Sequence, residues 1–351
     1  MAMDSQTMEN TCNDAGSIKP VAIIILNWNG SELLRRFLPS VVEHSDRRIS
    51  RIIVADNGSS DDSIEVLQQQ FPEVEILRFD SNYGFAEGYN RALEAIESKY
   101  TILLNSDAAA TPGWDVELFD YMENHPDVGA CQPKLMSFDS PDTFEYAGAC
   151  GGYIDRNGYP YCRGRIFATC EKDSGQYDTV EDIHWATGAA LMVRRSVYID
   201  CGGLDPRFFA HMEEIDLCWR IRLAGWRIVA VPSSTVYHLG GGSLSAENPK
   251  KTYLNFRNNL LMLHKNLPDN IRSGFLVKRR LLDTIAWLKY VLCFDWRNAS
   301  AIVRAHRDFA KMRTSYTGHP DTNLMDKDRR GRCNILVQYY IRGRKVFSEL
   351  K

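Results

Sequence analysis

Two groups of carboxylates in this 351-residue sequence could together act on a phosphate-linked substrate. Asp107 follows closely on the apolar run 100–104, and a run of acids begins about a hundred residues later at Glu213. A carboxylate at the tip of a buried strand suits a divalent cation and the phosphate that the cation binds. The later carboxylates could accept the proton of an attacking hydroxyl. Together the two groups indicate nucleotide-sugar chemistry.

The cation site is predicted around Asp107, with Asn105 and Ser106 directly before it. Asp107 offers one carboxylate to a cation that bridges two phosphates, although an aspartate at a strand end could equally cap the following turn. His238, just before three glycines, is the candidate second ligand. Histidine suits Mn²⁺ better than Mg²⁺, but a lone histidine is also commonly an ordinary packed residue. The expected cofactor is a divalent cation, Mg²⁺ or Mn²⁺.

The candidates for a general base are Glu213, Glu214 and Asp216, in the first turn of a predicted helix. The helix dipole favours negative charge there, which keeps carboxylates ionised and is also a purely structural reason for acids at this position. Asp216 lies four residues before Arg220, the spacing of a helical ion pair. Because that pair leaves Glu214 unexplained, Glu214 is the first choice for the base, with Glu213 and Asp216 after it.

A nucleoside site is predicted at the ends of the first two strands. Asp56 could accept a hydrogen bond from N3–H of uracil or thymine, or it could only cap the turn that follows it. Asn27 and Asn29, in the turn after the first strand, could line the same nucleoside. The glycine-flanked start of a later helix could bring backbone N–H groups to a ribose or phosphate. The donor-binding candidates in that segment are Asn82, Gly84, Phe85 and Asn90.

Strands and helices alternate along the first half of the chain, which predicts an α/β fold with a doubly wound, mostly parallel sheet and a Rossmann-like nucleotide-binding half. Ser31 is predicted to cap the first helix, and Thr111-Pro112 to open a later one. Ligands of such sheets bind at the carboxyl ends of the strands, where Asn27, Asp56 and Asp107 fall. The predicted elements are strands at 21–26, 51–56, 74–79 and 100–104, with helices from 31 and over 85–96.

The rest of the chain divides into three parts by composition. Residues 137–183 are rich in turn pairs and predict an insertion over the site with hairpins. A strand at 188–193, a helix over 213–224 and a strand at 226–231 complete a domain spanning 21–245. Residues 1–20 predict a loose leader, and residues 246–351 a basic helical C-terminal extension.

The charge is distributed unevenly, although the formal net charge is only -3. Residues 250–351 contain 22 Lys and Arg against 8 Asp and Glu. Such a basic segment with amphipathic stripes predicts peripheral contact with an anionic membrane, or else a solvated helical face. The best apolar stretch, 281–294, is too short and too charged to span a bilayer. Nine cysteines without a close C-x-x-C pair favour a reducing cytosol, so the predicted location is cytoplasmic, on or near the inner face of the membrane.

Taken together, these segments resemble the family 2 inverting glycosyltransferases of the GT-A fold, in particular the bacterial rhamnosyltransferase-like branch. The matching segments follow the family's order from residue 21 to about 242. They are 26–30, 54–61, 82–90, 104–107, 187–195, 202–205 with 208–209, 213–220, 224–226 and 236–238.

The resemblance implies that Asp56 contacts the pyrimidine, that Asp107 closes a D-x-D-type motif, that His238 completes the metal shell and that the pair Glu213-Glu214 holds the base. Two departures are present. Asn105 replaces the first aspartate of the motif, and Glu214 stands where relatives often carry Asp. The Q-x-x-R-W signature of processive synthases is absent, so we expect one sugar per encounter, moved from a UDP- or dTDP-sugar such as dTDP-rhamnose to a lipid-linked or cell-surface glycan.

Two other classes of function compete with this interpretation. A sugar-nucleotide nucleotidyltransferase would need a glycine-rich, lysine-containing loop after the first strand, and the segment 27–30 has no lysine. A nucleic-acid-binding protein is suggested by the basic extension, but the stacking motifs of such proteins are not found. We therefore expect no nucleic-acid partner.

Overall fold

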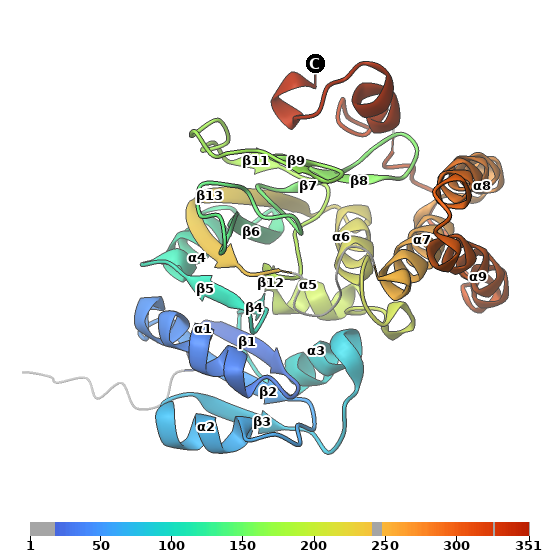
Figure 1. The fold of residues 1–351 in the computed structure, drawn as a ribbon. Helices are drawn as coiled ribbons and strands as arrows, with labels where there is room; N and C mark the ends of the chain where they lie inside the picture. Colours follow the sequence, from blue (N-terminus) through green and yellow to red (C-terminus); the bar gives the residue numbers. More distant parts are fainter. Residues whose placement is uncertain (1–17, 241–247, 326, 351) are drawn as a thin grey trace, which may run out of the picture.

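A computed structural model describes residues 18–240, 248–325 and 327–350 of the chain. Most of the predicted leader and the predicted boundary near residue 245 lie outside these ranges. Within them, a central sheet is covered by helices, a smaller sheet lies beside it, and three long helices follow (Figure 1).

The first half of the central sheet is parallel, as predicted. Its strands are β1 (Val21–Asn27), β2 (Ser50–Asp56), β3 (Glu75–Arg78) and β4 (Tyr100–Leu104). β1 lies between β2 and β4, and Asn27 is in register with Asp56. The strand tips that carry these two residues therefore meet at one edge of the sheet.

Both faces of this sheet are buried, which explains why the first strand is a continuous apolar run. Side chains of β1 alternate between two hydrophobic cores, with Ala22 and Ile24 in one and Val21, Ile23 and Ile25 in the other. The helices in this half are α1 (Ser31–His44), α2 (Ser63–Gln70) and α3 (Gly84–Ala95).

Two predicted helix starts are wrong in detail. Helix α1 has Gly30 at its N-cap, and the backbone N–H of Ser31 donates to Asp61 Oδ2 at 3.0 Å, so a distant carboxylate caps it. Helix α4 (Trp114–Asn124) begins after Gly113, which has φ 74°. The Thr111 hydroxyl donates instead to the carbonyl of Thr235 at 2.7 Å. In both cases a long-range partner replaced the local cap.

The second half of the sheet is mixed. β12 (Ala190–Arg194) runs antiparallel between β4 and β6 (Val128–Ser137), and β13 (Arg227–His238) is parallel to β6. β13 is longer than the predicted 226–231, because after an irregularity between 231 and 235 it continues along β6 and pairs with β5 (Ala108–Ala110). The short β11 (Glu181–Asp182) closes the edge, and α5 (Arg195–Asp200), η1 (Pro206–Phe208) and α6 (Glu213–Leu223) complete this half.

The segment 137–183 forms hairpins, as predicted, and they make a separate small sheet. Its strands, in the order β10-β9-β8-β7, are β7 (Gly152–Ile154), β8 (Pro160–Cys162), β9 (Arg165–Ile166) and β10 (Thr169–Cys170). The end of the chain covers it (Figure 1), and the rings of Tyr153 and Phe347 stack with centroids 5.7 Å apart.

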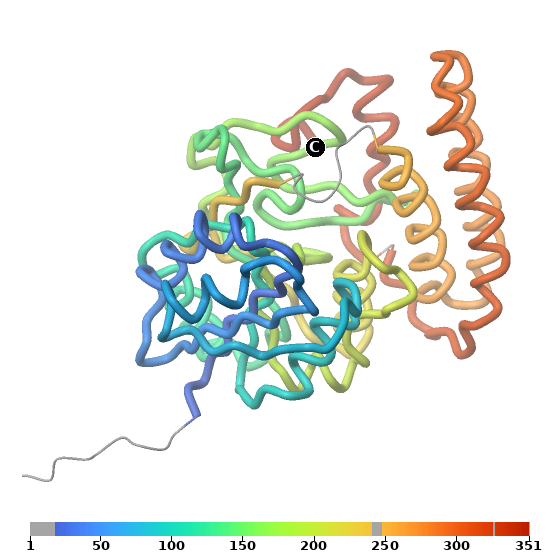
Figure 2. The backbone as a smooth tube through the Cα atoms, turned by 60° about the horizontal axis from the view of Figure 1, so that its bottom comes forward, coloured from blue at the N-terminus to red at the C-terminus, as the bar shows by residue number. Residues whose placement is uncertain are grey.

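The C-terminal part is helical, as predicted. Helices α7 (Pro249–Asn266), α8 (Asp269–Leu292) and α9 (Trp296–Met312) lie side by side along one flank of the molecule (Figure 2), and α7 contacts α6 of the sheet domain. Short helical turns η2 (Arg313–Ser315), η3 (Val337–Ile341) and η4 (Phe347–Glu349) follow. In the described ranges, no helix is both long enough and apolar enough to cross a membrane.

Candidate active site

The tips of β1 and β2 form a buried polar pair. Asn27 and Asp56 are 0% and 2% exposed, and Asn27 Nδ2 donates to Asp56 Oδ1 at 3.1 Å. The other carboxylate oxygen of Asp56 accepts from the backbone N–H of Ser59 at 3.1 Å. Asn27 Oδ1 is buried without a hydrogen-bond partner, so this edge retains an unused acceptor. Unsatisfied buried acceptors are uncommon, and a ligand N–H is one way to satisfy them.

The turn after β2 is fixed by the turn after β1. Asn29 Oδ1 accepts from the N–H of Ser60 at 2.7 Å, and the N–H of Asn29 donates to Ser59 Oγ at 2.9 Å. Gly58 has φ 72°, and a Cβ there would lie 2.7 Å from backbone atoms of Ser81. The predicted nucleoside residues Asn27, Asn29 and Asp56 therefore lie together in one rigid edge.

The start of α3 lies beside this edge. Asn57 Nδ2 donates to Asn82 Oδ1 and to the carbonyl of Gly84, both at 3.1 Å. Gly84 has φ 78° and no atom within 4 Å of a built Cβ, so its backbone borders open space. Phe85 packs edge-on against Tyr89 with centroids 4.9 Å apart. Asn82, Gly84 and Phe85 therefore join the predicted donor edge.

Asn90 lies further along α3 and is used structurally. Its Oδ1 accepts from the Tyr198 hydroxyl at 2.7 Å and from the N–H of Leu204 at 2.9 Å. Its Nδ2 donates to the carbonyl of Leu204 at 2.8 Å. Asn90 thus ties α3 to the segment 198–204, apart from the other predicted donor residues.

Asp107 and His238 meet because β5 pairs with β13, with Ala108 opposite His238. His238 Nε2 lies 3.0 Å from Asp107 Oδ1 and 3.2 Å from Asn105 Nδ2. On the other side of the ring, Nδ1 lies 3.3 Å from Glu145 Oε1. Asn105 and Ser106 occupy the turn that leads to Asp107.

The charges in this cluster are strongly coupled to one another. Burial lowers the pKa of His238, but its contacts with Asp107 and Glu145 outweigh burial and raise the pKa to about 10. Burial raises the pKa of Asp107, yet the hydrogen bond and charge of His238 leave it below its ordinary value. Both shifts favour a protonated imidazole beside the carboxylate of Asp107.

These residues fit a divalent cation in part. Asp107 offers an oxygen and His238 a nitrogen, while Glu145 is placed to fix the imidazole from behind, an arrangement common around metal-bound histidines. Within the described ranges no three His, Cys, Asp or Glu residues gather as a complete metal site. A cation held here would need oxygens from the substrate or water, and His238 would have to lose its proton to bind it.

The acids of α6 are set for proton transfer. Burial, and then the neighbouring charge of Glu214, raise the pKa of Glu213 well above its ordinary value. Burial raises the pKa of Glu214 to about 7, although backbone N–H groups of the first helical turn oppose the rise. Each glutamate has one buried oxygen without a hydrogen-bond partner. A carboxylate with a pKa near neutrality and a free oxygen is suited to general base catalysis.

Glu214 lies close to Gly188, in the segment before β12. Gly188 has no side chain, and a Cβ built there would lie 3.6 Å from both Glu214 Cβ and Phe85 Cζ. Ala189, the next residue, accepts a hydrogen bond from the N–H of Asn105 at 3.0 Å. Gly188 therefore adjoins Glu214, and the next residue, Ala189, bonds Asn105 directly after β4.

The loop before α6 has an unusual backbone. Phe209, His211 and Met212 have φ of 67°, 69° and 75°, a region that residues other than glycine rarely adopt. Asn258 of α7 stabilises this loop, because its Nδ2 lies within 2.8–2.9 Å of the carbonyls of Phe208, Ala210 and His211. A residue of the C-terminal helices therefore sets the entry to the base helix.

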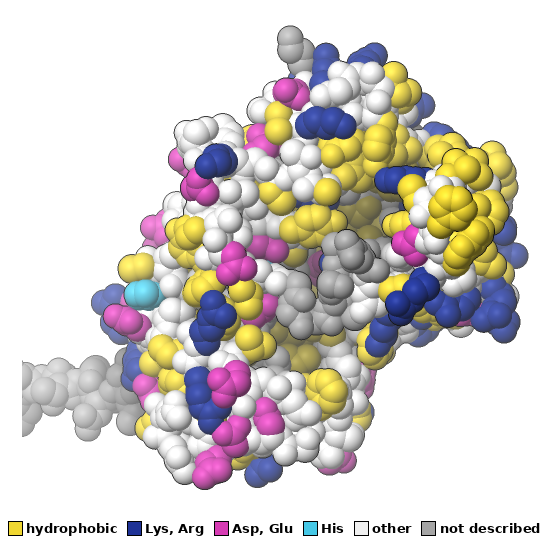
Figure 3. All heavy atoms as spheres, viewed as in Figure 1, with side chains coloured by type: hydrophobic (Ala, Val, Ile, Leu, Met, Phe, Trp, Pro, Cys, Tyr) yellow, Lys and Arg dark blue, Asp and Glu magenta, His cyan; other side chains and the backbone are white. Residues whose placement is uncertain are grey.

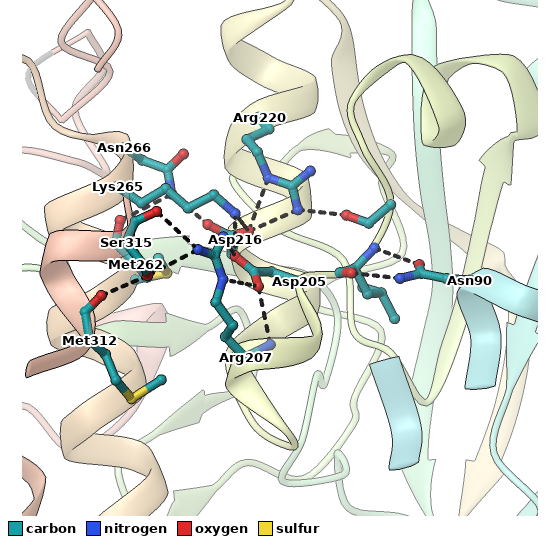
Figure 4. A network of polar contacts seen from close by, with 12 residues as sticks. Asn90, Asp205, Arg207, Asp216, Arg220, Met262, Lys265, Asn266, Met312 and Ser315 are labelled. Atoms are coloured by element: carbon teal, nitrogen blue, oxygen red, sulfur yellow. Dashed lines mark hydrogen bonds and ion pairs between the residues drawn. The ribbon is translucent and has the colours of Figure 1, made fainter. Parts of the chain in front are cut away.

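Asp216 lies at the centre of a polar network (Figure 4). It is 0% exposed, and its carboxylate accepts from Arg220 Nη2 and Lys265 Nζ at 2.8 Å each and from Asn266 Nδ2 at 2.7 Å. Lys265 also reaches Asp205 at 3.0 Å. Both carboxylate oxygens of Asp216 have hydrogen-bond partners, and these bonds connect α6 to α7. Glu213 and Glu214, by contrast, each have one oxygen without a partner.

The match to a known family agrees with this geometry. Residues 22–202, just over half of the chain, match the family described as glycosyl transferase family 2. This chain is a family 2 glycosyltransferase. The reaction class is therefore glycosyl transfer rather than nucleotidyl transfer.

Among its curated relatives, this glycosyltransferase is similar to the N-acetylglucosaminyl-diphospho-decaprenol L-rhamnosyltransferase of Mycobacterium tuberculosis. The two are 28% identical over 230 residues, which cover 62% of this chain and 75% of the relative. The predicted rhamnosyltransferase-like membership of family 2 is confirmed.

Two solved structures share the fold of this glycosyltransferase. Staphylococcus aureus TarS 1-349 in complex with UDP-GlcNAc has a TM-score of 0.56 at 12% identity, covering 84% of this chain and 81% of its own. GalNAc-T7 with UDP, GalNAc and Mn²⁺ has a TM-score of 0.55 at 14% identity, over 72% of this chain. This chain covers only 48% of the length of GalNAc-T7. The predicted GT-A fold is confirmed.

Three groups that the structure places at the site were not found from the sequence. Glu145 lies in the irregular segment 137–183, and Asn258 and Lys265 lie in the basic extension, so each is more than 40 residues from its partner. Local spacing gives no signal for such contacts. The unsatisfied carboxylate oxygens of Glu213 and Glu214 likewise appear only in three dimensions.

Proposed function

We propose that this enzyme transfers one sugar, with inversion, from a nucleoside diphosphate sugar to a hydroxyl of a lipid-linked or cell-surface glycan. The observation that carries the proposal is Glu214, a half-buried glutamate with one oxygen that lacks a partner, next to Gly188 and so one residue from the carbonyl that bonds Asn105. The M. tuberculosis relative is named for rhamnosyl transfer to a lipid-linked diphosphate sugar, which supports a deoxyhexose donor such as dTDP-rhamnose and an acceptor of that class.

In this proposal the residues divide into three roles. Asp56 and Asn27 bind the pyrimidine, with Asn29, Asn82, Gly84 and Phe85 around the nucleoside. Asp107 and His238, with Asn105 and Ser106 beside them, would hold a divalent cation that neutralises the departing diphosphate. Glu214 takes the proton from the attacking hydroxyl of the acceptor glycan, and Glu213 is the neighbouring carboxyl group.

Asp216 and Asn90 have structural roles in the proposal. Both have all their side-chain polar atoms bonded within the protein, so neither has a free group to offer a substrate. Asp216 sets the position of α6, and Asn90 sets the position of α3. Glu213 and Glu214 each keep an oxygen without a partner, and we take Glu214, the more exposed of the two, as the catalytic base.

The role of Glu214 can be tested with a variant that keeps its shape. We expect Glu214→Gln to abolish sugar transfer while donor binding, followed by calorimetry with UDP or dTDP and Mn²⁺, stays within about twofold, because an amide cannot accept a proton at neutral pH. Asp120→Asn, an exposed side chain on α4, is the control and should retain full activity. Substantial turnover by Glu214→Gln would contradict the assignment and move the base to Glu213.

We also propose that the enzyme lies on the cytoplasmic face of an anionic membrane and contacts it through α8 and the α8–α9 turn. Helix α8 buries two charged residues along with Leu276, and it exposes several of its other large apolar side chains. Arg279 and Asp283 are 4% and 1% exposed and bond to each other, whereas Leu281 and Ile285 are 64% and 65% exposed. A helix with this inverted arrangement has its apolar face available for another apolar phase.

The exposed face has the composition of a membrane contact. Figure 3 shows hydrophobic side chains gathered over α8 and α9, with Lys and Arg beside them. The exposed apolar residues follow one helical stripe and continue into the turn. They are Val277, Leu281, Ile285, Leu288, Leu292, Phe294 and Trp296. Exposed basic residues next to this stripe, such as Lys278, Arg280 and Lys289, would favour anionic lipid headgroups.

Flotation with vesicles tests this contact. We expect the protein to float with phosphatidylcholine vesicles that contain phosphatidylglycerol, and to float poorly with phosphatidylcholine alone. The double variant Leu281→Ser/Phe294→Ser should lose flotation, whereas Ile199→Ser, an exposed apolar residue on α5, should not. If the double variant floats like the wild type, or if it changes only the oligomeric state seen by light scattering, the face does not contact lipid.

A further inference from the structure

An open pocket lined by arginines lies between the small sheet and the end of the chain, and the transferase site described above does not include it. Its volume is about 470 Å³, within the roughly 300–1,000 Å³ typical of small-molecule sites. The arginines that line it are Arg156, Arg329, Arg330, Arg332 and Arg342.

The pocket is a product of the fold rather than of one flexible segment. The N–H of Arg156 donates to the carbonyl of Cys333 at 2.9 Å, and the Tyr161 hydroxyl donates to the carbonyl of Arg330 at 3.0 Å. Asn157 Nδ2 donates to Asn334 Oδ1 at 3.1 Å. These contacts join residues about 170 positions apart, so the walls keep a fixed relation to each other.

Among the residues that the structure describes, the lining carries five positive charges and no carboxylate. Two aspartates near the pocket, Asp155 and Asp328, already have hydrogen-bond partners elsewhere in the protein. Asp155 accepts from the N–H groups of Asn157, Tyr159 and Ile335, and Asp328 is 2.7 Å from His184 Nε2. Among the described residues, no acidic side chain pairs with any of the five arginines.

Their mutual repulsion is therefore not relieved within the described part of the chain. Arg330 is half-buried with its guanidinium 4.4 Å from the ring centroid of Phe347, which keeps its position fixed. The other four arginines are exposed, and Arg332 Nε donates to the carbonyl of Asp328 at 3.3 Å. A multivalent anion in the pocket would lower the electrostatic free energy of all five.

We propose that this pocket binds a phosphate-bearing ligand, most favourably a diphosphate. The planar guanidinium group donates two parallel hydrogen bonds to phosphate oxygens, and several such groups around one pocket match a diphosphate rather than a single carboxylate. The apolar side of the pocket, formed by Val337 and Leu350, would accept an organic group attached to the phosphate. The site is separate from Asp107 and Glu214, so it binds independently of the sugar donor.

Calorimetry with inorganic pyrophosphate tests the site on the full-length protein, in EDTA so that no divalent cation supports binding at Asp107. We expect saturable binding that weakens as salt is raised. Arg329→Gln/Arg342→Gln should weaken it by about ten- to a hundredfold, since each removes a charge-assisted hydrogen bond. Neither side chain has an ion pair within the described ranges, so the variant should keep the melting temperature of the wild type. Arg47→Gln, which removes an exposed arginine paired with Glu73, is the matched control.

Vesicles distinguish the two sources of phosphate. The vesicle comparison uses the Leu281→Ser/Phe294→Ser background, which removes the expected contact through α8. If phosphatidylglycerol vesicles compete there with pyrophosphate, and Arg329→Gln/Arg342→Gln removes both ligands, the site binds a lipid headgroup. If pyrophosphate binding alone is lost, the ligand is a free phosphate compound. Both results support the pocket as a phosphate site. Absence of pyrophosphate binding to the wild type, or equal binding by the wild type and Arg329→Gln/Arg342→Gln, would overturn the proposal.

Discussion

The substitution Asp216→Asn separates a structural from a catalytic role for the acid that the sequence could not assign. Asp216 is fully buried and accepts from Arg220, Lys265 and Asn266. The asparagine has the same shape but no charge, so it leaves two cations without their shared counter-charge. Glu213 and Glu214 are unchanged by the substitution.

The size of the effect follows from burial. Removing one partner of a buried ion pair costs about 3–5 kcal/mol. Arg220 and Lys265 are 16% and 18% exposed, so water screens part of the loss, and Asp205 still contacts Lys265 at 3.0 Å. We therefore expect the free energy of unfolding to fall by about 2–4 kcal/mol, which corresponds to roughly 3–5 °C in melting temperature for a protein of this size.

Urea denaturation followed by tryptophan fluorescence measures the stability, and initial rates with saturating donor measure kcat. We expect kcat to fall by less than about tenfold, because Asn258 still stabilises the loop before α6. The double variant Asp216→Asn/Lys265→Met should lose less stability than the sum of the single variants, since they share one interaction. Asp120→Asn serves as the exposed control. Loss of activity without loss of stability would refute the structural assignment and make Asp216 a catalytic residue.

Three further outcomes follow from the geometry. Glu214 must be ionised to accept a proton, and its pKa is raised to about 7, so kcat/KM should increase with pH up to about 7 and then level off. A pH profile of kcat/KM that is flat between about pH 5 and 8 would contradict this role. Gly58→Ala should lower the free energy of unfolding by at least about 1 kcal/mol, because its Cβ would lie 2.7 Å from the backbone of Ser81. The same change should weaken donor binding, which calorimetry with UDP measures. Asp283→Ala should destabilise the protein by about 3–5 kcal/mol, since no other acid among the described residues pairs with the buried Arg279. An unchanged midpoint of urea denaturation would show that this ion pair does not stabilise the fold.

The fold of the first half could be predicted because its signals are local. Each parallel strand is buried on both faces, so it appears in the sequence as an unbroken apolar run, and the strand at 100–104 has the predicted bounds. The polar residue that ends each run then falls at one edge of the sheet. For this reason the sequence was enough to predict that Asn27 and Asp56 lie at a common edge, where they are in register and hydrogen-bonded.

Helix starts and the end of the last strand were less predictable. Ser31 and Thr111 have the residue types of caps, but Asp61 and Thr235 compete for the same hydrogen bonds across the fold. The last strand continues to His238 because β6 and β5 pair with it, which its own residues do not indicate. A local preference worth about 1 kcal/mol is easily outweighed by a tertiary contact.

The sequence by itself determined which side chains are available for chemistry, because residue type and strand periodicity set their charge and the edge at which they lie. Only the tertiary structure decided how each is used. Spacing pairs Asp216 with Arg220, but only the structure shows that Lys265 and Asn266 also bond Asp216, whereas Glu213 and Glu214 each keep one oxygen without a partner. The reason is that hydrogen bonding and desolvation depend on neighbours distant in the chain, and local spacing contains no information about them.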